Sequence, residues 1–161
     1  MDDPRPAIRR SVDGAASITF DARHRPIMIA TWVGAPTVAL IERAQAWIDQ
    51  VYADARAMGS SGIVFISEAT NVKLPSVAAR RRILELRHDP ELMLGVFAVV
   101  PIRNVLMHGL LRALTRALGE GSGFAIATSF EQALDLAEQA FVRNGLPVPE
   151  SLDRLRIERR E

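Results

Sequence analysis

Three continuous apolar runs, separated from one another by amphipathic segments, constrain the fold of this chain most strongly. They are residues 63–67 (IVFIS), 95–100 (GVFAVV) and 124–128 (FAIAT). A strand that is apolar on both faces is typical of a parallel sheet covered by helices on each side. The alternation of such strands with helices therefore predicts an α/β fold with right-handed crossovers.

Two further strands precede these runs. Residues 17–20 (SITF) and 27–33 (IMIATWV) are rich in β-branched residues, and the short connection between them predicts an antiparallel pair. Together with the three apolar runs they predict a mixed, mostly parallel five-stranded sheet with a leading β-hairpin at its edge.

About four helices are expected between and after the strands, each with a capping residue at its start. The first has apolar residues at helical spacing from Ile41 to Met58, with Thr37 before them and Gly59 after them. The other three are predicted to begin after Ser76, Asn104 and Ser129. We expect residues 1–16 to be a flexible N-terminal arm, residues 17–145 to be the domain, and residues 146–161 to be a charged C-terminal tail.

Composition argues against several classes of function. Lys and Arg number 20 and Asp and Glu number 19, so no overall field attracts nucleic acid. The one tight basic cluster, Arg80–Arg82, would spread over about 200° of a helix and form no flat patch. With no cysteine and three scattered histidines, we expect no metal or other cofactor. The N-terminus lacks the apolar run of a secretory signal, and no stretch is long enough for a membrane span, so a cytoplasmic protein is expected.

No motif for catalysis stands in the required context. The stretch GSSG at residues 59–62 leads from a helix to a strand, the reverse of a nucleophile elbow. The stretch GEGSG at residues 119–123 follows a helix, whereas a phosphate loop precedes one. The sequence therefore predicts a protein that is not an enzyme. A hydrolase that uses Ser76 with His24 or His108 is a weak alternative.

The segment 102–118 is apolar around more of its circumference than a helix on one sheet face requires. This excess predicts a second buried surface, which could be a homodimer contact or extra packing against the terminal segments. A membrane-surface helix is disfavoured because its polar face has few cations. The candidate interface residues are Leu106, Met107, Leu110, Leu111 and Leu114. The alternative is a pocket for a small molecule or lipid, lined by Met93, Phe97, Met107 or Leu110.

The order of elements over residues 17–142 resembles the STAS-like superfamily, named for sulfate transporters and anti-sigma-factor antagonists. More narrowly, it is similar to bacterial stand-alone relatives that are grouped with STAS and CRAL-TRIO lipid-binding domains. The stretches that carry the resemblance are ITFDARHRPIMIATWVG, GIVFISEA, LPSVAARRRILEL and FAIATSFEQALDLAEQAF. The resemblance implies a STAS-like fold and a regulatory domain that binds protein, either a partner or a second copy of itself.

The resemblance also implies a candidate switch. In anti-sigma antagonists a serine or threonine at the start of the helix after the corresponding strand is phosphorylated, typically within Asp-Ser-Ser/Thr-Gly. Ser76 occupies a similar place, but Pro75 precedes it and Val77-Ala78 follow, so the acid and the glycine are absent. A phosphate there would add about −1.5 to −2 charges at a helix N-terminus, and Arg80 would lie on the same helical face. The simpler interpretation is that Ser76 only caps the helix.

Overall fold

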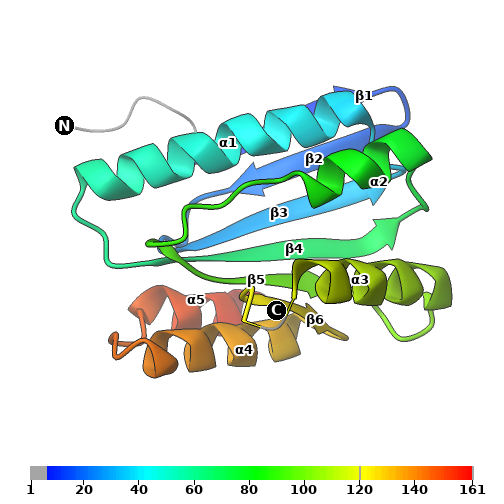
Figure 1. Ribbon diagram of the computed structural model, residues 1–161. Helices are drawn as coiled ribbons and strands as arrows, with labels where there is room; N and C mark the ends of the chain where they lie inside the picture. The colour runs from blue at the N-terminus through cyan, green and yellow to red at the C-terminus, as the bar shows by residue number, and fades with distance from the viewer. Residues whose placement is uncertain (1–6, 120, 161) are drawn as a thin grey trace.

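Six strands form one mixed sheet in the computed structural model, which describes residues 7–119 and 121–160. The strands lie side by side in chain order (Figure 1). The first three pair antiparallel, and the pairs from the third strand onward are parallel. Their bounds are β1 Ile8–Asp13, β2 Ala16–Asp21, β3 Ile27–Gly34, β4 Ile63–Val72, β5 Met93–Val99 and β6 Phe124–Ala127.

Five helices cover this sheet in two layers. Three of them pack on one face and two on the other, as Figure 1 shows. Those on the first face are α1 Val38–Ala57, α2 Val77–Leu84 and α3 Val105–Leu118, and those on the second are α4 Phe130–Arg143 and α5 Glu150–Glu158.

Alternate residues of each strand supply the two halves of the core, because successive side chains of a strand point to opposite faces. On the first face the ring of Phe20 stacks on Trp47 of α1 at 4.6 Å between centroids. On the second face Ile66 of β4 packs with Leu134 of α4 and Leu155 of α5. The α/β class, the leading hairpin and the mostly parallel sheet are thus confirmed.

The predicted number of strands and the predicted N-terminal arm need correction. Within residues 1–16, β1 forms an edge strand, so the sheet has six strands where five were expected. A two-residue turn with Gly14 at φ +59° closes the β1–β2 hairpin, in the manner of a type II′ turn. The sequence did not predict this strand, because β1 pairs with β2 alone and its side chains are half-buried or exposed. Its sequence therefore contains no apolar run. Residues 1–6 of the predicted arm lie outside the described residues.

The predicted C-terminal tail is also partly folded. Residues 150–158 form α5, which raises the helices to five where about four were expected. Leu152 and Leu155 of this helix are fully buried against β4, β5 and α4. Arg156 lies 2.9 Å from Asp135 and 2.7 Å from Glu138 on α4. The packed domain therefore extends well past residue 145.

Candidate functional site

The first four helices begin at one end of the sheet, where the parallel strands β3 to β6 reach their carboxyl ends. Ser76 lies at this end and caps α2, since its Oγ accepts a hydrogen bond of 3.1 Å from the Ala79 amide. Its side chain is exposed. Arg80 lies one turn later, and no described carboxylate pairs with its side chain. The capping role of Ser76 is confirmed, and a switch role for Ser76 and Arg80 stays a prediction.

Apolar side chains gather at this same end. In the part of the chain that the structure describes, the four most exposed large apolar side chains all belong to it. With one less exposed neighbour they form what we call the edge patch: Leu74, Val77, Ile102, Val105 and Leu106. Val105 and Leu106, in the first turn of α3, are 74% and 72% exposed. Basic residues accompany the patch at Lys73, Arg81 and Arg103, all exposed and without an ion pair among the described residues.

The predicted interface on α3 is corrected by the packing of that helix. Met107, Leu111 and Leu114 are buried in the chain's own core beneath α3, so they are not surface residues. Leu110 is half-buried against the same core, and Leu106 alone of the five is well exposed. The excess of apolar residues on this helix therefore serves internal packing, except in its first turn and at Leu118.

A pocket of about 280 Å³ lies between α2, α3 and the sheet. We call it the α2–α3 pocket. Ala69 of β4 and Ala98 of β5 form part of its floor, Ile83 belongs to the α2 wall, and Met107 and Leu111 belong to the α3 wall. Because alanines occupy the floor and α2 is short, the two helices leave this space above the sheet.

The predicted pocket residues are half correct. Met93 and Met107 line the α2–α3 pocket, whereas Leu110 is not part of its lining. Phe97 packs on the opposite face of the sheet, among residues of α4 and α5. Successive residues of a strand point to opposite faces of the sheet. Because Ala98 points into the pocket, its neighbour Phe97 must point away from it.

Polar groups in the pocket are few. Trp32 Nε1 donates a hydrogen bond of 3.1 Å to Ser67 Oγ, and both residues line the pocket. His88 also lines it, and its Nδ1 lies 3.0 Å from the hydroxyl of Tyr52. Burial lowers the pKa of His88 to about 4, although the negative charge of Asp49 acts to raise it. The imidazole is therefore neutral at physiological pH. Burial, reinforced by the charge of Asp89, raises the pKa of Tyr52, which keeps its proton.

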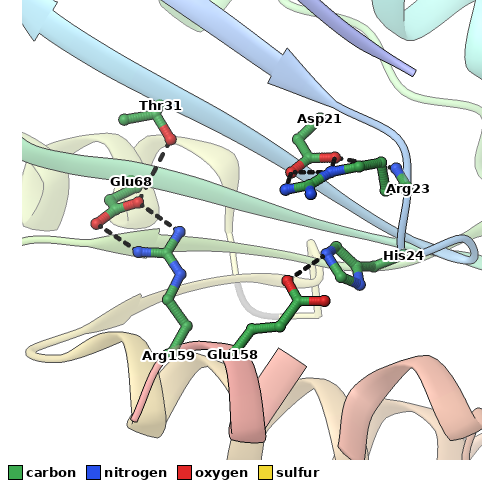
Figure 2. Close-up of polar contacts among 7 residues, drawn as sticks. All are labelled: Asp21, Arg23, His24, Thr31, Glu68, Glu158 and Arg159. Carbon is green, nitrogen blue, oxygen red and sulfur yellow. Dashed lines mark hydrogen bonds and ion pairs between the residues drawn. The ribbon is translucent and has the colours of Figure 1, made fainter. Parts of the chain in front are cut away.

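A separate polar cluster fastens α5 to the other face of the sheet (Figure 2). Buried His24 lies 3.3 Å from Glu158, and Arg159 pairs with Glu68 at 3.0 Å. The guanidinium of Arg159 also lies 3.9 Å from the centre of the Phe130 ring. Each of these contacts joins the end of α5 to another element, so we interpret the cluster as structural.

The arrangement gives no support to a Ser76 hydrolase. His24 precedes β3, whereas Ser76 follows the end of β4, and these parallel strands place the two residues at opposite ends of the sheet. His108 is engaged elsewhere, with Nε2 2.8 Å from the Val100 carbonyl oxygen. Among the described residues no group of His, Asp and Glu side chains could hold a metal ion. None of the described helices combines the length and hydropathy needed to cross a bilayer.

Comparison with known proteins was made at three levels. No family model matches the sequence, and no curated protein matches it. One solved structure that resembles it is an anti-sigma factor antagonist from Mycobacterium paratuberculosis, with a TM-score of 0.50 and 16% sequence identity. The match covers 78% of this chain and 96% of that one. At this identity the likeness concerns the fold alone, and the chain has the STAS-like fold that the order of its elements predicted.

Proposed function

We propose that this chain is a non-enzymatic regulatory module that binds a protein partner through the edge patch. The observation that carries the proposal is the gathering of exposed apolar side chains at the end of the sheet where Ser76 lies. Large apolar side chains exposed together at one end of a soluble domain are candidates for an interaction site. The anti-sigma factor antagonist with a similar fold supports a regulatory role.

The charges around the edge patch indicate the kind of partner. Lys73, Arg81 and Arg103 are exposed there without described ion pairs. An acidic surface with apolar side chains would complement them, because complementary charges speed association and reject wrong partners. Two copies of the chain meeting at this patch would bring like charges together. A different protein is therefore favoured at the patch, and self-association stays a prediction that light scattering over a dilution series can test.

Ser76 would serve as the switch of this module. Its hydroxyl is exposed and borders the edge patch. A phosphate on it would place about −1.5 to −2 charges among the surrounding cations and within reach of Arg80. That change would weaken the attraction of the patch for an acidic partner.

Capture from an extract of the source cells tests the partner proposal. The full chain, a V105E/L106E double variant and a V142E control are immobilised in parallel, and bound proteins are identified by mass spectrometry. Val142 is 62% exposed on α4, across the sheet from the patch. A glutamate at this position replaces an exposed apolar side chain, as the double variant does, but lies away from the proposed site. We expect a partner that the wild type and V142E retain and the double variant loses. Equal capture by all three would contradict the proposal.

A second candidate function is the transport or sensing of a small molecule. The α2–α3 pocket of about 280 Å³ favours it, since ligand sites are concave, mostly apolar and few per protein. Native mass spectrometry of freshly purified protein tests it directly. We expect an adduct on the order of 150 to 220 daltons that disappears after denaturation, and consistently unliganded protein would count against a carrier.

A further inference from the structure

Among the residues that the structure describes, the lining of the α2–α3 pocket includes no Arg, Lys, Asp or Glu. We propose that this pocket selects an uncharged small molecule that is mostly apolar and carries a hydrogen-bond acceptor, such as a ketone, aldehyde or ester. The inference rests on the second candidate function and adds the chemical class of the ligand. It is independent of the edge patch and its protein partner.

An uncharged lining among the described residues disfavours ionic ligands on energetic grounds. An ion that leaves water without a partner of opposite charge loses far more solvation energy than a pocket of apolar groups returns. A fatty-acid anion would need an Arg or Lys in the wall, and an amine would need a carboxylate. His88 supplies no charge either, because its half-buried imidazole is neutral at physiological pH.

The size of the pocket sets the scale of the ligand. A volume of about 280 Å³ corresponds to roughly nine groups of the size of a water molecule. It lies at the lower end of the range for small-molecule pockets. A single chain or a small ring system of roughly ten to seventeen heavy atoms matches this space at the packing density of a protein interior, whereas a lipid with two acyl chains does not.

Two polar groups of the lining are available as donors. The Ser67 hydroxyl accepts from Trp32 Nε1, and no described residue accepts the Ser67 proton. The Tyr52 hydroxyl faces His88 Nδ1 and keeps its own proton, with the Asp89 amide on its other side. With Tyr52 as the donor to Nδ1, the single proton of a neutral imidazole would lie on Nε2 and be free for a ligand. A ligand that offers an acceptor would satisfy these donors, and a pure hydrocarbon would leave them unpaired.

Fluorescence titration of the full chain with two related dyes tests the charge selection. N-phenyl-1-naphthylamine is uncharged, and 1-anilinonaphthalene-8-sulfonate is its sulfonated counterpart. We expect the uncharged dye to bind one per chain and at least about tenfold more tightly than the sulfonate. Displacement of the bound dye by decan-2-one, decanoate and decyltrimethylammonium at pH 7.5 then compares three head groups on similar chains. Decan-2-one should displace the dye at concentrations at least about tenfold lower than either ion.

Variants locate the site and the donor. Ala98→Leu fills the pocket from its floor and should abolish binding of the uncharged dye, while Ala46→Leu, an exposed position on α1, should leave it unchanged. Ser67→Ala should weaken decan-2-one about 3- to 10-fold and leave the dye within about twofold. His88→Phe keeps an aromatic ring but removes the N–H donor, so its affinity for decan-2-one tests the second donor.

The outcomes separate the inference from the function on which it rests. Binding of no probe, or binding that survives Ala98→Leu, would overturn the pocket as a ligand site and the carrier function with it. Binding of decanoate or decyltrimethylammonium as tight as that of the ketone would overturn the uncharged class and leave a carrier in place. Unchanged ketone affinity in both Ser67→Ala and His88→Phe would overturn the requirement for an acceptor.

Discussion

The hydroxyl of Tyr52 lies 3.0 Å from Nδ1 of His88, and the two rings meet edge to face with 6.0 Å between their centroids. The Phe65 ring lies 5.2 Å from His88 on the same side of the sheet. This aromatic group packs the segment after α2 against α1 and β4, and one of its members, His88, lines the α2–α3 pocket. The stability of this part of the pocket wall therefore depends on the protonation of one half-buried imidazole.

Acid should destabilise the fold through His88. Burial lowers its pKa in the folded protein to about 4, whereas an unperturbed histidine, as in an unfolded chain, has a pKa of about 6.5. The unfolded state therefore binds more protons between these values, and stability is lost as pH falls from about 6.5 to 4. We expect a loss of roughly 3 kcal/mol from this group between pH 7 and pH 4. Urea unfolding at a series of pH values measures it.

The control for that experiment is the variant His88→Phe, which removes the titrating group and keeps a ring of similar shape. Carboxylates titrate in the same range in both proteins, so the difference between the two pH profiles isolates His88. Parallel profiles across the acid range would show that His88 does not carry this dependence.

The C-terminal helix α5 should contribute to global stability. Leu155 is 2% exposed against β4, β5 and α4, and replacing a buried leucine by alanine costs about 2 to 5 kcal/mol. Ile157, two residues later, is 61% exposed, so Ile157→Ala should change stability by less than about 0.5 kcal/mol. Thermal and urea unfolding of the two variants provide the comparison. Equal effects would mean that α5 is not packed as the structure has it.

Capping by Ser76 should be separable from any regulatory role. Ser76→Ala removes the acceptor of the Ala79 amide and should cost about 1 kcal/mol. Ser76→Asp retains a good capping side chain and should leave stability within a few tenths of a kcal/mol of the wild type. Urea unfolding measures both, and capture of the partner by Ser76→Asp then reports on charge alone. If Ser76→Ala left the free energy of unfolding unchanged, capping would not explain this serine.

Much of the fold could be read from local chemistry. Thr37, Ser76, Asn104 and Ser129 were each expected to begin a helix, and each accepts a hydrogen bond from the backbone three residues later. The buried strands could also be predicted from the sequence, because a short apolar run between two turn signals fits few structures other than a buried strand. Such features depend on neighbours in the sequence, and these are visible without a structure.

The parts that were missed depend on distant neighbours or on weak local signals. β1 carries no apolar run, although Gly14, a residue favoured at the first central position of a type II′ turn, was a hairpin signal that could have revealed it. The α2–α3 pocket follows from the end of α2 at Leu84 and from small residues on the sheet beneath it. The residues that line such a space depend on the lengths of neighbouring helices and on which face of the sheet each strand residue points to. The apolar face of a single helix does not reveal either.

Close packing at the β1–β2 turn yields the last prediction. Gly34 ends β3 with φ +77°, and a Cβ on it would lie 2.9 Å from the Ala15 carbonyl oxygen in that turn. Gly145 has a similar φ of +66° but open space around it. The left-handed conformation alone should make Gly145→Ala cost about 1 to 2 kcal/mol. Gly34→Ala should cost at least about 1 kcal/mol more, because a backbone atom cannot move aside without disturbing the hairpin. Urea unfolding of the two variants measures the difference, and equal losses would show that the β1–β2 turn does not press on the end of β3.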